Sequence, residues 1–139
     1  MREILFKAKR DGNGEWVEGC YAECKGKTFI GIGTSIGIDV LKGFCTPVIR
    51  WFEVDPETLC QFTGLTDKNG NKIWENDVIQ YGTVAAVTKF GEYGNGGLGF
   101  YVDFPEETNY RKDFSYWAKK VVVIGNAFDD QELLQEVPE

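Results

Sequence analysis

Alternation of apolar and polar residues is the dominant pattern along this chain, and it predicts β-strands. Residues 2–10 alternate charged and apolar side chains, as expected for a strand with one buried face. A turn signal at 11–14 separates this strand from a second one at 15–23. A Lys-Gly-Lys turn then leads into a third strand at 28–30. Together these features predict a β-meander over residues 2–32.

The next region, residues 31–47, has a weaker pattern in which four glycines interrupt the apolar positions. We expect a loop that contains a short strand. The apolar run that follows at 48–54 predicts a buried strand, and Pro56–Thr58 predicts a turn. Near that turn the chain divides into an N-terminal β-rich region, residues 1–57, and a second region, residues 58–139.

Strand signals are denser after this division. The dipeptide Asn69–Gly70, one of the strongest hairpin signals, lies between two strand-like segments. The predicted strands occupy residues 61–65, 78–81, 82–89, 98–104 and 119–124, the last of them buried. Glycines at 91–97 predict a long flexible hairpin tip. Asp129 with Glu132 predicts the start of a short helix at 131–135.

Composition adds a core and a charge to this picture. Ten Phe, six Tyr and four Trp residues supply material for an apolar core in a chain of 139 residues, without metals or disulfides. The formal charge is −7, from 22 acidic and 15 basic residues. This charge opposes a general attraction to nucleic-acid backbones or anionic lipids. Nine acidic residues lie within 101–139, where we expect a solvated acidic face or, as the alternative, a partner-facing surface.

Cysteine and histidine content limits the chemistry further. The four cysteines, Cys20, Cys24, Cys45 and Cys60, form no Cys-x-x-Cys pair, and the chain contains no histidine. A structural zinc site is therefore not expected. The N-terminus has no apolar signal segment, and no apolar run reaches membrane length. We expect a cytoplasmic protein with reduced, mostly buried thiols.

Two glycine-containing motifs resemble ligand loops but predict turns. Gly94, Gly96 and Gly99 fit the dinucleotide pattern Gly-x-Gly-x-x-Gly, but a strand rather than a helix is predicted after them. The segment 67–71 resembles the start of a calcium loop. Its glycine stands at the fourth position instead of the sixth, and Val78 stands where a carboxylate is needed. No cofactor and no metal are therefore expected.

Acidic residues are the remaining candidates for catalysis. They form three clusters, at residues 53–57, 75–77 and 103–107. Two carboxylates that converge in a cleft could perform acid–base hydrolysis or bind magnesium. Without histidine, a Ser–His or Cys–His pair is impossible. Alternation favours a solvent-exposed face for Glu53 and Asp55, and Asp77 is expected to accept hydrogen bonds from turn amides. We therefore predict a protein that is not an enzyme.

The segment 110–120 is the candidate nucleic-acid interface. It combines four aromatic and four basic residues with one acidic residue. Small β-barrels bind single strands through exposed aromatic residues interleaved with basic ones. The predicted contacts are Arg111, Lys112, Tyr116, Trp117, Lys119 and Lys120. In the alternative interpretation the aromatic residues are core and the charges line the outer face. Exposure of Tyr116 and Trp117 distinguishes the two.

Three segments, in the same order along the chain, resemble the YopX family of phage and prophage proteins. They are residues 2–8, residues 54–58 with 61–70, and residues 123–126 with 132–134. The resemblance implies an SH3-like barrel over about residues 58–128, after a more variable β region. Members carry Glu-Gly-Asp where this chain has Glu75-Asn76-Asp77, and Asn tolerates positive φ better than most residues. The family provides no catalytic residues and implies a bacterial virus or prophage as the context.

We therefore predict a mostly β protein with a C-terminal SH3-like barrel, an N-terminal β extension and a short C-terminal helix. Its expected function is that of a non-enzymatic binding or assembly module. The expected partner is a protein, either a second copy of the chain or a phage or host component. Nucleic-acid binding through 110–120 is the alternative. The exposed barrel edges and the glycine-rich loops at 31–37 and 91–97 are the expected contact elements.

Overall fold

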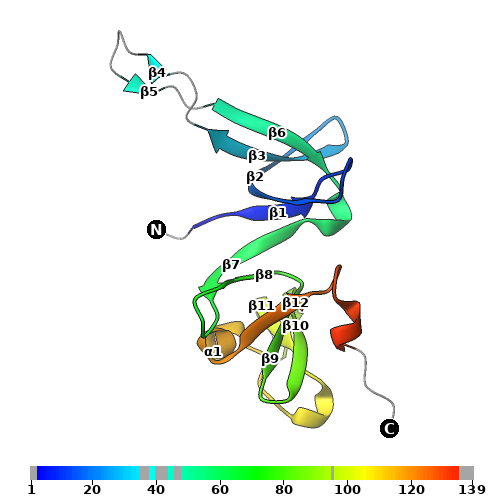
Figure 1. Cartoon of the computed structure of the whole chain (residues 1–139). Helices are drawn as coiled ribbons and strands as arrows, with labels where there is room; N and C mark the ends of the chain where they lie inside the picture. The colour runs from blue at the N-terminus through cyan, green and yellow to red at the C-terminus, as the bar shows by residue number, and fades with distance from the viewer. Residues whose placement is uncertain (1–2, 35–37, 40–43, 46–47, 95, 135–139) are drawn as a thin grey trace. The chain divides into compact units, whose positions relative to one another are not determined.

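The computed structural model describes residues 3–34, 38–39, 44–45, 48–94 and 96–134 of the chain. These residues are mostly in antiparallel β-strands, which confirms the mostly β class expected from the alternating pattern. They form two compact units, Glu3–Gln61 and Phe62–Glu139, here called the N-terminal and C-terminal units. Figure 1 shows the N-terminal unit in blue to green and the C-terminal unit in green to red.

The N-terminal unit is an antiparallel meander in the order β1-β2-β3-β6. Its strands are β1 (Phe6–Lys9), β2 (Trp16–Cys24), β3 (Lys27–Thr34) and β6 (Val48–Val54). The single 3₁₀ turn η1 (Pro56–Thr58) then leads to Cys60 and Gln61, which pair with β1. A separate short ladder joins β4 (Ile38–Asp39) to β5 (Phe44–Cys45). Arg10 also bridges to Val54, so the end of β6 contacts the chain just after β1.

The core of the N-terminal unit is small. Ala8, Ile30 and Val54 are fully buried in it, and four partly buried side chains pack around them. These four are Phe6, Val17, Tyr21 and Leu59. Each of the strands β1, β3 and β6 contributes one of the buried residues, because alternate side chains along a strand point to one face. The meander predicted over residues 2–32 is thus confirmed.

Three predictions for this unit are wrong. The strand predicted at 48–54 exists, but Ile49 and Trp51 are about half exposed, because they lie on the opposite face of the edge strand β6 from the buried Val54. The loop predicted from residue 31 begins later, because Gly31–Thr34 belong to β3; residues 35–37 lie outside the described residues. Cys20 and Cys24 are exposed rather than buried, whereas Cys60 is buried.

The C-terminal unit contains a four-stranded antiparallel sheet in the order β11-β10-β9-β12. Its strands are β9 (Asp77–Tyr81), β10 (Val84–Tyr93), β11 (Gly97–Asp103) and β12 (Val122–Asn126). The hairpin of β7 (Cys60–Thr66) and β8 (Lys72–Trp74) precedes this sheet. Four short helical turns complete the unit: η2 (Glu106–Thr108), α1 (Phe114–Trp117), η3 (Ala118–Lys120) and η4 (Gln131–Leu134).

One large cluster forms the core of the C-terminal unit, with nine buried residues in the described part of the chain. They are Ile73, Ile79, Ala86, Val102, Phe104, Phe114, Trp117, Ala118 and Val121. The sheet, the β8 strand and the helical segment α1–η3 all contribute to this cluster. The turn between β7 and β8 is attached to β12, because the Asp67 carboxylate accepts a hydrogen bond from Val123 N–H at 3.0 Å.

The helical segment α1–η3 was not predicted, and it changes one predicted boundary. Lys119 and Lys120 lie in η3, so the strand predicted at 119–124 begins only at Val122.

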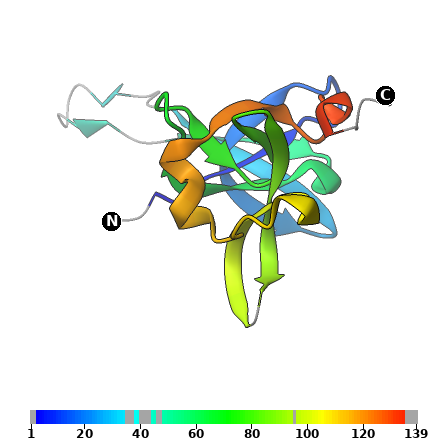
Figure 2. The same cartoon turned by 90° about the horizontal axis from the view of Figure 1, so that it is seen from below.

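The glycine-rich tip predicted at 91–97 is shorter than expected, because β10 runs to Tyr93 and β11 begins at Gly97. Figure 2 shows this β10–β11 hairpin as a yellow-green arm beyond the rest of its unit. The C-terminal helix is present as the 3₁₀ turn Gln131–Leu134; residue 135 lies outside the described range.

Candidate functional site

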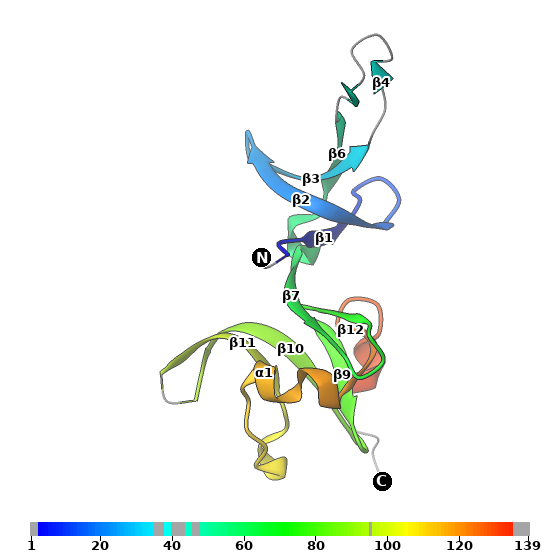
Figure 3. The ribbon, with the colours of Figure 1, turned by 90° about the vertical axis from the view of Figure 1, so that its left-hand side faces the viewer.

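The segment 110–120 folds as a short loop followed by two helical turns. Two backbone contacts attach the loop to β11: Val102 N–H donates to the carbonyl of Lys112 at 2.9 Å, and Tyr101 forms a β-bridge with Asp113. Asp113 keeps an extended backbone, and α1 begins at the next residue. Figure 3 shows α1 next to the β10–β11 hairpin. The helix presents residues three or four positions apart on the same face, rather than every second residue as a strand would.

Trp117 is the centre of an aromatic cluster on this segment. Its side chain is buried, and the indole Nε1 donates to the carbonyl oxygen of Arg111 at 2.7 Å. Three tyrosines surround the indole, with ring centroids 4.8 Å away for Tyr81, 5.4 Å for Tyr110 and 5.0 Å for Tyr116. Each tyrosine keeps between 38% and 41% of its surface exposed. We call these three tyrosines and Trp117 the tyrosine cluster.

Two of the predicted phosphate contacts, Arg111 and Lys112, are each paired with a carboxylate. Arg111 Nε and Nη2 donate to the two carboxylate oxygens of Asp113 at 2.6 and 2.7 Å. These hydrogen bonds raise the pKa of Arg111 and lower the pKa of Asp113. Lys112 Nζ lies 3.9 Å from a carboxylate oxygen of Asp103. A phosphate group would have to compete with a carboxylate at both positions.

Tyr116 and Lys120 contact each other within the exposed part of the predicted interface. Lys120 Nζ donates to the Tyr116 carbonyl oxygen at 2.8 Å and lies 3.9 Å from the centroid of the Tyr116 ring. The guanidinium carbon of Arg111 lies 4.4 Å from the same ring. Lys119 is exposed on η3. The structure thus brings Arg111, Tyr116 and Lys120 together, while Trp117 lies behind them in the core.

Two residues of this surface lie outside the segment, and sequence reasoning missed both. Tyr81 ends strand β9 and contacts the rings of Trp117 and Tyr110. Lys68 lies in the β7–β8 turn and lines a groove together with Lys120. Strand pairing and the turn contact bring these residues to the segment. Only a prediction of strand order, which no local sequence signal provides, could have placed them there.

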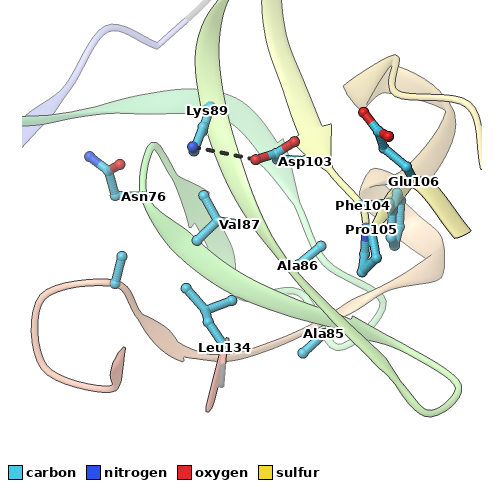
Figure 4. A pocket seen from close by; sticks show the side chains of 11 residues that line it. Asn76, Ala85, Ala86, Val87, Lys89, Asp103, Phe104, Pro105, Glu106 and Leu134 are labelled. Atoms are coloured by element: carbon cyan, nitrogen blue, oxygen red, sulfur yellow. Dashed lines mark ion pairs between the residues drawn. The ribbon is translucent and has the colours of Figure 1, made fainter. Parts of the chain in front are cut away.

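A separate pocket of about 520 Å³ lies in the C-terminal unit and is the place where carboxylates could act chemically. Its lining includes Ala85, Ala86, Val87, Pro105 and Leu134 as apolar residues, and Lys89, Asp103 and Glu106 at the polar side. Figure 4 shows the Asp103 carboxylate turned toward Lys89. Their charged atoms are 3.4 Å apart, so the carboxylate that would otherwise be the candidate base has a cationic partner.

The other acidic residues have structural contacts. Glu53 lies 3.6 Å from Lys27 in an exposed ion pair, and Asp55 accepts a hydrogen bond from Glu57 N–H at the start of η1. Asp77 accepts from Trp74 N–H at 2.8 Å, which confirms its predicted turn role. Across the described ranges, no three His, Cys, Asp or Glu side chains are grouped closely enough to hold a metal ion.

The two glycine motifs are turns, as predicted. Gly94 and Gly96 lie in the hairpin between β10 and β11, and Gly99 lies within β11, so a strand follows the motif. In the segment 67–71, Asp67 Oδ1 accepts hydrogen bonds from the N–H groups of Asn69 and Asn71, both at 2.9 Å. The carboxylate therefore closes its own turn.

Comparison with known families shows to which family the chain belongs. The model of the family described as YopX protein matches residues 6–135, nearly the whole chain. The chain belongs to the YopX family. A search of curated proteins gives no significant match. No helix in the described part of this YopX family member is long and apolar enough to cross a membrane.

The family pattern explains one backbone feature. Asn76, at the position where members carry glycine, has φ of +70°, as predicted for this turn. Its backbone N–H donates to the carbonyl of Thr88 at 2.7 Å, and its own carbonyl accepts from Ala127 N–H at 2.8 Å. The turn thus connects β10 with the chain after β12. Its role is structural, and it supports the unit that carries the tyrosine cluster.

Proposed function

We propose that this protein is a non-enzymatic binding module and that the tyrosine cluster is its protein-binding surface. The observation that carries this proposal is the set of three partly exposed tyrosines around one buried tryptophan. Tyr, Trp and Arg dominate the centres of protein interfaces, because they offer a large contact area with few rotatable bonds. Trp117 fixes the tyrosines before a partner arrives, which reduces the entropy lost on binding.

The charge distribution favours a protein partner over a nucleic acid. Arg111 and Lys112 are already paired with carboxylates, so they offer little to a phosphate backbone. Residues 62–139 contain seven basic and thirteen acidic residues, and this excess repels a polyanion. Nucleic-acid binding stays the second candidate, because the exposed ring of Tyr116 beside Lys120 is the arrangement that single-strand binders use.

The pocket beside β10 supports the non-enzymatic part of the proposal. A general base must be free to accept a proton from a substrate. Asp103 instead lies within ion-pair distance of Lys89 and Lys112.

Family membership supports three further parts of the proposal. The first part is an SH3-like barrel in the C-terminal unit, which is supported by the attachment of the β7–β8 turn to β12 and by Ile73 of β8 in the core of the four-stranded sheet. The biological context is a bacterial virus or prophage, and the protein acts in the cytoplasm of the host cell. Its partner is a phage or host protein, or a second copy of the chain.

Selection from a displayed library of random peptides tests the protein-binding function. Peptides selected on the full chain are synthesised, and their affinity is measured by fluorescence anisotropy for the unchanged protein and for Tyr116→Ser. We expect micromolar binders that lose about tenfold in affinity with Tyr116→Ser. Tyr93→Ser serves as the matched control, because Tyr93 is on the β10–β11 arm and stacks on Tyr101 instead.

Two results would contradict the protein-binding function. One is a selection that yields no binding peptide, and the other is peptides that bind Tyr116→Ser as well as the unchanged protein. Labelled single-stranded DNA and RNA are measured in parallel at two salt concentrations. Salt-sensitive micromolar binding to these strands, lost with Arg111→Gln and Lys120→Gln, would support the nucleic-acid alternative.

A further inference from the structure

A cationic groove of about 350 Å³ lies beside the tyrosine cluster. Its lining residues are Lys68, Gln80, Gly82, Lys120 and Val122. Two of these five residues carry positive charge, and none of them is acidic. Tyr81, a member of the tyrosine cluster, stands between Gln80 and Gly82 in the chain. The groove is thus a basic site within a unit that is acidic as a whole.

The fold holds the two lysines of this groove in place although they are far apart in sequence. Lys68 N–H donates to the carbonyl of Val121 at 3.0 Å, which places the β7–β8 turn against the start of β12. The adjacent Asp67 fixes the same turn through the bond from Val123 N–H. Lys120 is held by its hydrogen bond to the Tyr116 carbonyl oxygen, and the ammonium keeps two further donors.

Two ammonium groups at one groove, with no carboxylate in its lining, match an anionic ligand. At an exposed groove, a carboxylate placed between both ammonium groups gains two charge-assisted hydrogen bonds. A long polyanion is disfavoured, because the remainder of the C-terminal unit carries an excess of acidic residues. A short acidic stretch of peptide avoids that repulsion while it reaches both the groove and the tyrosines.

We propose that the groove of Lys68 and Lys120 binds carboxylate side chains of an acidic peptide segment whose apolar residues contact the tyrosine cluster. This inference rests on the proposed protein-binding function and names the chemistry of the partner. Lys68 adds a positive charge to the groove from outside the segment 110–120, and Gln80 offers an amide at the same groove. The groove makes the binding specific for acidic peptides, and the tyrosine cluster provides most of the contact area.

Three labelled peptides test the inference with the full chain. They share length and apolar residues, and their alternate positions carry Glu, Gln or Lys. Anisotropy at low salt is expected to show binding of the Glu peptide about tenfold tighter than the Gln peptide. Lys68→Gln is expected to remove this preference. Lys119→Gln is the matched control, because Lys119 is exposed on the same helical turn as Lys120 but does not line the groove.

The outcomes separate the inference from the function on which it rests. Equal binding of Glu and Gln peptides, with both weakened by Tyr116→Ser, overturns the groove inference and leaves the protein-binding function standing. Failure of all three peptides to bind at millimolar concentration overturns the inference, and the unbiased library selection then decides the function. Tighter binding of a labelled oligo(dT) than of the Glu peptide, abolished by Lys68→Gln, also overturns it in favour of nucleic acid. Tryptophan fluorescence confirms that each variant is folded.

Discussion

The two units of this protein are stabilised in different ways. The C-terminal unit buries a cluster of nine apolar residues around Trp117 and Phe104, whereas the buried cluster of the N-terminal unit consists of Ala8, Ile30 and Val54 within the ranges described. The N-terminal unit depends more on its strand ladders and on close backbone packing. The comparison teaches where a preorganised surface can form: exposed tyrosines stay fixed only where a large core lies beneath them.

Glycine packing shows the backbone dependence of the N-terminal unit. A β-carbon at Gly19 would collide with the carbonyl oxygen of Gly31. A β-carbon at Gly31 would lie 2.7 Å from the side chains of both Ile49 and Trp51. The neighbouring strands of the N-terminal unit therefore approach each other closely at these glycines.

The largest expected effect comes from Trp117→Ala. Removing the indole leaves a cavity in the larger core and an unpaired Arg111 carbonyl, and we expect a loss of about 4 kcal/mol in the free energy of unfolding of the C-terminal unit. Amide hydrogen exchange reports each unit separately. The expected result is faster exchange in β9–β12. Ile30→Val, a much smaller deletion in the core of the N-terminal unit, is expected to cost about 1 kcal/mol. Unchanged exchange in β9–β12 with Trp117→Ala would contradict the central place of the indole in the larger core.

The next effect tests the N-terminal unit through Gly19→Ala. The added methyl group would collide with the Gly31 backbone, which cannot rotate away as a side chain could. We expect a loss of about 2–3 kcal/mol, measured by urea denaturation with circular dichroism. Gly33→Ala is the control, since a β-carbon there meets no atom within 4 Å. A loss at Gly33 as large as that at Gly19 would show that the strand propensity of the new residue, and not close packing, sets the loss of stability.

The sequence predicted the strands of both units well, and it failed where tertiary contacts decide. Strand signals identified β2, β9 and β10, although β9 and β10 each bury three consecutive residues instead of one alternating face. The segment 114–120 is helical despite its aromatic content, because Trp117 and Phe114 must both enter one core from a short connection. The exposure of Trp51 could not be predicted either, since an edge strand and a central strand carry the same apolar residues.

The candidate site was predicted in part. Arg111, Tyr116 and Lys120 lie together, as the composition of their segment suggested. The pairing of Arg111 with Asp113 was not predicted, although the two residues are only two positions apart, because side-chain direction depends on the backbone between them. Tyr81 and Lys68 required the strand order. Local sequence thus predicts which segment forms the surface, and the fold determines which of its charged side chains are free to bind a partner.

Asp67→Asn separates the turn of the C-terminal unit from its core. Burial alone would raise the pKa of Asp67, but hydrogen bonds from the N–H groups of Val123, Asn71 and Asn69 outweigh this and hold the pKa below its usual value. Stability from Asp67 is therefore fully present above its unfolded pKa of about 3.9 and is lost as pH falls through the lower folded value.

For Asp67→Asn we expect a loss of about 2 kcal/mol at neutral pH, because charge-assisted hydrogen bonds become neutral ones and one amide donor faces another donor. Urea denaturation at several pH values measures the difference between the variant and the unchanged protein. That difference is expected to shrink as pH falls below about 4. A difference independent of pH would show that the charge of Asp67 contributes nothing, and that only the shape of its side chain matters.

The smallest expected effect isolates the backbone at Asn76. Replacement by Ala or by Gly removes the same side-chain amide, so the difference between the two variants reports only the cost of φ at +70°. We expect Asn76→Ala to be less stable than Asn76→Gly by about 1 kcal/mol in urea denaturation, because a β-carbon is strained in the left-handed region. Equal stability would mean that the turn relaxes to negative φ when the amide is gone. The backbone of this turn would then contribute little to the stability of the C-terminal unit, and the difference in stability between the two units would lie in their cores.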